Sequence, residues 1–125
     1  MATTVVHCKK DAYDVYIGRP ASGGIEHYGN PFTHKATKTL AQVVLPTCKE
    51  AIEAFRLWLL GEAYQEVNPE QRQWVLANAS ALQGKRLGCW CKPLSCHGDT
   101  LALLADLGLE SLKTPPPAAV QMEIL

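Results

Sequence analysis

The sequence predicts a single α/β domain in which helices pack on a small sheet, in a Rossmann-like or related three-layer arrangement. Three observations support this prediction. Short runs rich in β-branched residues open the chain, two helix patterns occupy its middle, and a strand, a tight loop and a further helix follow. Helices and strands that alternate at such spacings usually form a sheet covered by helices.

Two strands are predicted near the start of the chain. Residues 3–9 are rich in Thr and Val, and residues 14–18 contain β-branched and aromatic residues. Because only a short turn separates them, we expect an antiparallel hairpin. Residues 19–33 contain three glycines and two prolines and should form a loop. Loops of this length without regular structure are often functional.

Two helices are predicted in the middle of the chain. Thr47 and Glu50 have the spacing of a capping box, which predicts a helix over residues 48–63. Apolar residues then recur at helical spacing. The pair Asn68-Pro69 predicts a second helix, which runs to about residue 82 and is followed by glycine.

A strand over residues 85–90 and a helix that begins at Cys96 or His97 complete the predicted domain. We place this domain at residues 1–112. Residues 113–125 contain three consecutive prolines and lack periodicity, so we expect an extended tail.

Composition limits the partners. The 12 basic and 12 acidic residues give a net charge of zero, so we expect no nucleic acid partner. No apolar run approaches the ~20 residues that span a bilayer, and no signal peptide pattern is seen. The five cysteines are few and odd in number, which favours reduced thiols and a cytoplasmic location.

Three of these cysteines and one histidine lie together near the end of the domain. Cys89, Cys91, Cys96 and His97 are residue types that bind Zn²⁺ in a tetrahedral site. However, the first pair is separated by one residue and the second pair is adjacent, which are unusual spacings for zinc ligands. We therefore assign no cofactor, and a zinc-stabilised interaction module remains an alternative.

A second interpretation of this stretch is nucleophilic. A thiolate is stabilised at a helix N-terminus, where Cys96 is predicted, and His97 and Asp99 could act as acid, base or orienting group. Gly98 could let a ligand approach the backbone. The structural alternative is that these cysteines are small buried residues, and we prefer this alternative for Cys89.

The loop after the second strand carries another candidate site. Arg19 could bind a phosphate or carboxylate, and Asn30 could contact a base edge or a ribose. Phe32 or Tyr28 could stack on a ring, and Gly18 lies beside the arginine. The alternative is a rigid turn in which Phe32 fills the core.

The motifs Tyr-Ile-Gly-Arg-Pro, Gly-Asn-Pro-Phe, Gly-Lys-Arg-Leu-Gly-Cys-Trp-Cys and Cys-His-Gly-Asp together resemble the domain-of-unknown-function family DUF4326 of bacteria and their phages. The resemblance covers roughly the first 107 residues, with an apparent insertion over residues 21–27. It implies that the two candidate sites are the defining blocks of the family and form one shared site. It also implies an accessory role in host takeover or counter-defence, in the host cytoplasm if the protein is phage-encoded.

These observations lead to one leading functional hypothesis, which is binding of a small phosphorylated ligand, a nucleotide or an ADP-ribose-like molecule. Arg19 and the N-terminus of the last helix, with Gly18 and Gly98, would hold the phosphate. Asn30 and Phe32 would surround the base or sugar. Turnover of a hydrolase or glycosidase type would use Cys96, His97 and Asp99. The alternative is sequestration of a nucleotide immune signal without catalysis.

Overall fold

The computed structural model describes residues 2–20, 24–33, 43–90 and 95–113. Cys91 and the predicted tail, apart from Lys113, lie outside these ranges. Among the described residues, no helix is long and apolar enough to cross a membrane.

The central element is a three-stranded parallel sheet of β1 (Thr4–His7), β5 (Arg86–Cys89) and β2 (Val15–Tyr16), in that spatial order. Its middle strand is the last in sequence. The predicted hairpin is therefore wrong, because the first two strands do not pair with each other. Leu87 of β5 is aligned with Val5 on one side and Val15 on the other, and its side chain is completely buried.

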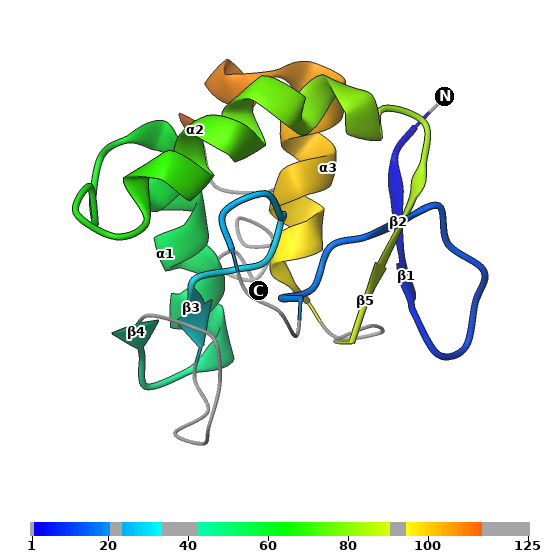
Figure 1. Ribbon diagram of the computed structural model, residues 1–125, viewed down its shortest axis with the longest axis horizontal. Coiled ribbons are helices and arrows are strands. Elements are labelled where there is room, and N and C mark those ends of the chain that lie inside the picture. Colours follow the sequence, from blue (N-terminus) through cyan, green and yellow to red (C-terminus); the bar gives the residue numbers. More distant parts are fainter. Residues whose placement is uncertain (1, 21–23, 34–42, 91–94, 114–125) are drawn as a thin grey trace, which may run out of the picture.

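The chain crosses from β1 to β2 over the outer face of this sheet, and a glycine makes room for the crossing. Residues 8–14 run back along the sheet to the start of β2 (Figure 1). A Cβ atom on Gly88 would lie 2.6 Å from Cγ of Tyr13. Asp14 then fixes the start of β2, since its carboxylate accepts a 2.9 Å hydrogen bond from the backbone N–H of Arg86.

The helices begin close to where their sequence signals predict. They are α1 (Cys48–Leu60), α2 (Pro69–Asn78) and α3 (His97–Leu107), and 3₁₀ turns follow α2 (Ala79–Leu82) and α3 (Leu109–Lys113). The capping box of α1 is confirmed, because Thr47 Oγ1 accepts a hydrogen bond from the backbone N–H of Glu50 at 3.1 Å. A second parallel pair, β3 (Phe32–Thr33) and β4 (Val43–Val44), lies beside α1.

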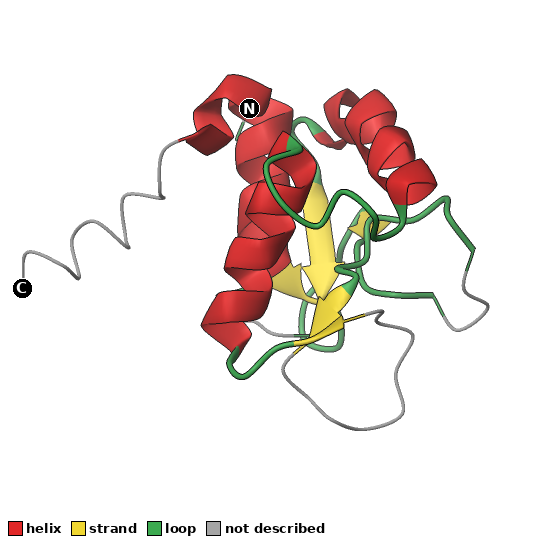
Figure 2. Ribbon diagram, turned by 90° about the vertical axis from the view of Figure 1, so that its left-hand side faces the viewer, coloured by secondary structure: helices red, strands yellow, loops and turns green. Residues whose placement is uncertain are grey.

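The described helices lie to one side of the three-stranded sheet and over its upper end in Figure 1. Figure 2 shows the molecule from the side of α1, with strands visible between the helices. The core between the layers is formed by Phe55, Trp58 and Leu59 of α1, with Leu87 and Leu101 from β5 and α3. The α/β class is thus confirmed, whereas the Rossmann-like three-layer arrangement is not.

Both α1 and α3 begin at the end of the molecule where β5 ends (Figure 1). In open parallel sheets, ligands bind outside the carboxyl ends of the strands, where helix N-termini also gather. The fold therefore places the two candidate regions of the sequence at the same edge.

Candidate functional site

A cavity of about 280 Å³ lies at this carboxyl edge. It brings together residues after β2, in the following loop, at the end of β5 and in the first turns of α1 and α3. The lining residues are Gly18, Arg19, Asn30, Phe32, Thr33, Cys48, Ala51, Ile52, Cys89, Trp90, Cys96 and His97. The loop and the thiol stretch, which are distant in sequence, thus share one cavity.

Among the described residues that line the cavity, Arg19 carries the positive charge. Its Nη1 donates a 2.7 Å hydrogen bond to the backbone carbonyl of Asn30, which holds the guanidinium against the loop. Gly29 permits this close packing, because a Cβ atom there would lie 2.7 Å from Cγ of Arg19. A guanidinium positioned in this way can present its planar fork to an anionic group.

Asn30 and Phe32 hold the loop on α1. The Asn30 side chain accepts a hydrogen bond from the Phe32 N–H at 2.9 Å and donates one to the Ala51 carbonyl at 3.2 Å. The Phe32 ring packs against Trp58 and Tyr64 and is only 1% exposed. Its face is therefore buried in the core, which supports the rigid-turn alternative over stacking on a ligand.

Tyr28, the other aromatic candidate of the loop, is also committed to packing. Its ring lies edge-on to Trp74, with a centroid separation of 4.8 Å. Its hydroxyl donates a 2.9 Å hydrogen bond to the carbonyl of Asn78. Neither expected stacking residue thus presents a ring to a ligand.

Cys96 is the N-cap of α3. Its Sγ accepts a hydrogen bond from the backbone N–H of Gly98 at 3.2 Å, and Asp99 Oδ2 accepts one from the Cys96 N–H at 3.1 Å. This reciprocal arrangement is a capping box. The amide of Gly98 and the carboxylate of Asp99 therefore both form hydrogen bonds that cap the N-terminus of α3. Cys96 itself is 1% exposed.

Gly98 has a packing role. A Cβ atom at this position would lie 2.6 Å from Cδ1 of Ile17 and 2.9 Å from Cγ1 of Val5. The glycine therefore lets the first turn of α3 approach the sheet. Neither Gly98 nor Asp99 belongs to the cavity lining, so the structure places these two predicted site residues beside the cavity and not in its wall.

His97 joins the end of β2 to the glycine-rich loop. Its Nε2 lies 2.8 Å from the carbonyl oxygen of Ile17 and 3.0 Å from that of Tyr28. Because both partners are acceptors, Nε2 carries the proton. The ring packs edge-on against Phe55, with centroids 5.1 Å apart. Burial lowers the pKa of His97 below its ordinary value of 6.5, so the imidazole is neutral at pH 7.

The thiols of Cys89 and Cys96 meet at the cavity wall. Their Sγ atoms lie 3.2 Å apart, which is a hydrogen-bonding distance for sulfur. Within the described ranges, no group of three or more His, Cys, Asp or Glu side chains is arranged to hold a metal ion. Cys91, the remaining member of the proposed zinc set, lies outside them.

Sequence reasoning missed two residues of the cavity. Cys48 was given no role, yet it lines the cavity from the first turn of α1. Trp90 was likewise given no role, yet it lines the cavity and is 55% exposed. One available signal was strand alternation, which places Trp90 on the face opposite Cys89, directly after the strand ends.

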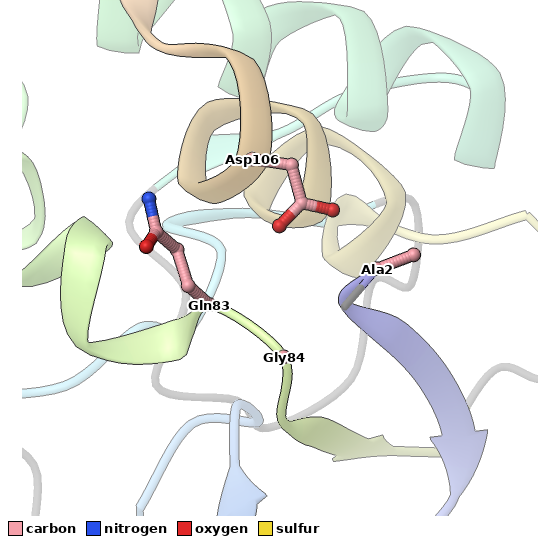
Figure 3. Close-up of a pocket in the computed structure, with 4 residues that line it drawn as sticks. All are labelled: Ala2, Gln83, Gly84 and Asp106. Carbon is pink, nitrogen blue, oxygen red and sulfur yellow. The ribbon is translucent and has the colours of Figure 1, made fainter.

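A wider depression of about 780 Å³ lies at the opposite edge of the sheet, between Ala2, Gln83, Gly84 and Asp106 (Figure 3). Its polar groups stabilise the fold. Asp106 accepts hydrogen bonds from the N–H and hydroxyl of Thr3 at 2.9 and 2.5 Å, and Gln83 donates one to the carbonyl of Ala105 at 2.7 Å. It is an open surface, and it contains neither candidate block of the sequence.

The fold is that of a small α/β domain with a cavity at the carboxyl edge of a parallel sheet. The chain belongs to the family DUF4326, a domain of unknown function whose family model matches residues 5–107. No curated protein and no solved structure matches the chain.

Proposed function

We propose that the protein binds a small phosphorylated ligand of the nucleotide or ADP-ribose-like class in the cavity at the carboxyl edge of the sheet. The observation that carries this proposal is the position of Arg19. Its guanidinium lines a cavity that the first turns of both α1 and α3 also line. A guanidinium at a partly enclosed cavity favours an anionic group at the same place.

The expected geometry at α3 is revised in this proposal. Because Cys96 and Asp99 cap that helix, the Gly98 N–H is already engaged and a carboxylate lies nearby. The phosphate is therefore assigned mainly to Arg19. The start of α1 contributes Cys48, Ala51 and Ile52 to the lining of the same cavity.

The candidate catalytic side chains are engaged in hydrogen bonds within the protein, which favours binding without turnover over catalysis. Cys96 caps α3, His97 Nε2 donates to two carbonyl oxygens, and Asp99 accepts the Cys96 N–H. A nucleophile and a base are expected to be aimed at the reacting group. The proposal is thus sequestration or sensing of the ligand, with hydrolysis as the alternative.

The test is thermal unfolding with a panel of nucleotides, NAD and ADP-ribose. A ligand present at a hundred times its Kd stabilises the folded state by about 2.7 kcal/mol, which raises the Tm by several degrees. We expect at least one phosphorylated compound to do so, and its dephosphorylated form to have a much smaller effect. If the whole panel leaves the Tm unchanged, the proposal is wrong.

The role of Arg19 is tested with Arg19→Gln and a matched control, Arg86→Gln. Arg86 is an exposed arginine at the other end of the same sheet, where it pairs with Asp14. Both substitutions remove one positive charge, but only the first removes it from the cavity. We expect Arg19→Gln to abolish the Tm shift and Arg86→Gln to preserve it. Incubation of the wild-type protein with the same compounds, followed by chromatography, detects turnover.

A further inference from the structure

Trp90 is an exposed aromatic side chain that is held in place. It is 55% exposed, although its class of side chain is usually well buried. The indole Nε1 donates a 2.8 Å hydrogen bond to the hydroxyl of Tyr16. The ring of His7 lies edge-on to it at 6.0 Å. These contacts fix the indole at the surface before any ligand arrives, which lowers the entropic cost of using it for binding.

Trp90 is also the aromatic group that the cavity offers to a ligand. Among the described residues that line the cavity, the aromatic side chains are Phe32, Trp90 and His97. Phe32 is 1% exposed and His97 is 8% exposed. A planar group that enters from solvent can therefore stack on the indole but not on the other two rings.

The size of the cavity indicates that only part of a nucleotide fits inside it. Its volume of about 280 Å³ lies just below the roughly 300–1,000 Å³ that small-molecule sites usually have. A sugar phosphate can occupy such a space, whereas a complete nucleotide needs additional surface. That surface is present where the exposed Trp90 adjoins the cavity that Arg19 lines.

A ligand base can displace Lys9, which contacts the indole of Trp90 in the free protein. The ammonium group of Lys9 lies 5.4 Å from the centroid of the Trp90 ring. A cation–π contact at an exposed site is weaker than the stacking of a base on an aromatic side chain. A base can thus take the place of this flexible lysine and gain binding energy.

We propose that Trp90 is the base-binding residue of the site, stacking on the planar base of a mononucleotide whose sugar–phosphate part enters the cavity toward Arg19. This inference rests on the proposed function and specifies its ligand as a mononucleotide with an exposed base. It transfers the stacking role from Phe32 and Tyr28 to the exposed residue that directly follows β5.

The experiment compares AMP with ribose 5-phosphate by isothermal titration calorimetry. The variants are Trp90→Ala, Trp90→Phe and the matched control Tyr13→Ala. Tyr13 is an exposed aromatic residue on the outer face of the same sheet, and it does not line the cavity. Circular dichroism and the Tm of each variant report whether it folds.

We expect Trp90→Ala to weaken AMP binding by roughly fivefold to a hundredfold, the range for loss of one base–aromatic stack. Ribose 5-phosphate should bind this variant as it binds the wild type. Trp90→Phe should retain most of the affinity for AMP, and Tyr13→Ala should retain all of it. AMP should also quench the tryptophan fluorescence of the wild type but not that of Trp90→Ala.

The inference and the proposed function fail in different ways. If Trp90→Ala loses affinity equally for AMP and for ribose 5-phosphate, Trp90 maintains the shape of the cavity and does not stack on the base. This result would overturn the stacking role. Unchanged AMP binding would overturn it as well. If neither compound binds the wild type, both the mononucleotide inference and this form of the proposed function are wrong.

Discussion

The imidazole of His97 donates a hydrogen bond to the carbonyl of Ile17 across 2.8 Å, from the first residue of α3 to the residue after β2. This bond places a titratable group where the last helix meets the sheet and the loop. Protonation would force a charge into a buried position, so the stability of the fold depends on pH.

Acidification should destabilise the fold through His97. Burial lowers the pKa of His97, and burial also lowers the pKa of His27 in the loop. Below the ordinary pKa of 6.5, the unfolded chain binds protons that the folded chain does not. The stabilising contribution is therefore complete above pH 6.5 and is lost as the pH falls below it. Urea unfolding at pH 7.5, 6 and 5 measures this loss.

His97→Gln provides the comparison, because an amide can still donate to the carbonyl of Ile17 but does not titrate. We expect its free energy of unfolding to fall less steeply between pH 7.5 and 5, with His27 accounting for the remaining slope. The carboxylates of Asp14 and Asp106 have lowered pKa values and titrate below this range. An unchanged slope in His97→Gln would contradict the assignment.

Cys96 should tolerate serine better than alanine. Serine is a favoured N-cap and offers an oxygen to the Gly98 N–H in place of Sγ, whereas alanine leaves this amide unpaired. We expect Cys96→Ala to lose about 1 kcal/mol of stability and Cys96→Ser to lose less. Equal losses in urea unfolding would show that Sγ packing, not capping, dominates. If a turnover reaction is found, its loss in the stable serine variant would identify Cys96 as a nucleophile.

Gly98→Ala should destabilise the protein, although alanine is the better helix former. The helix propensity gain is at most about 1 kcal/mol. The new Cβ would lie 2.6 Å from the completely buried Ile17, and such overpacking costs roughly 1–3 kcal/mol. A net loss of about 1 kcal/mol is expected in urea unfolding. Leu107→Ala, at the exposed end of α3, is the control and should be close to neutral; a stabilised Gly98→Ala would refute the close packing.

Protein purified in a reducing buffer should contain no stoichiometric zinc. Two thiolates on one tetrahedral zinc ion lie about 3.8 Å apart, wider than the 3.2 Å between Cys89 and Cys96. His97 Nε2 also donates to two carbonyl oxygens. Elemental analysis measures the metal content. One zinc ion per chain, lost together with stability on chelation, would establish the zinc-stabilised alternative.

The helix boundaries could be predicted because their signals are local. Thr47 and Glu50 meet within one turn, and the start of α3 at Cys96 follows from the change from a strand pattern to a helix pattern. The sheet order could not be predicted in this way. It depends on a crossing of Tyr13 over Gly88, which are remote in sequence, and on the hydrogen bonds between Asp14 and Arg86.

The prediction of which segments meet in one cavity agrees with the structure better than the roles predicted for individual residues. The resemblance to the family implied that Arg19 and the Cys96-His97 pair share a site, and both line one cavity. Phe32 was left between stacking on a ligand and filling the core, and Trp90 was given no role, because an aromatic residue in a loop and one after a strand look alike in sequence. Their exposure is decided by the tertiary structure, since Trp58 of α1 packs on Phe32, whereas Trp90 is exposed where β5 has ended.

The central position of β5 determines when the fold can form. Both β1 and β2 find their partner only in this strand, so the sheet cannot assemble until the ribosome has released residues 86–89. Until then, the first two strands expose unpaired edges to other chains. Contacts so distant in sequence also slow refolding. The nascent chain therefore reaches its native state in a late step, governed by a strand from its last third.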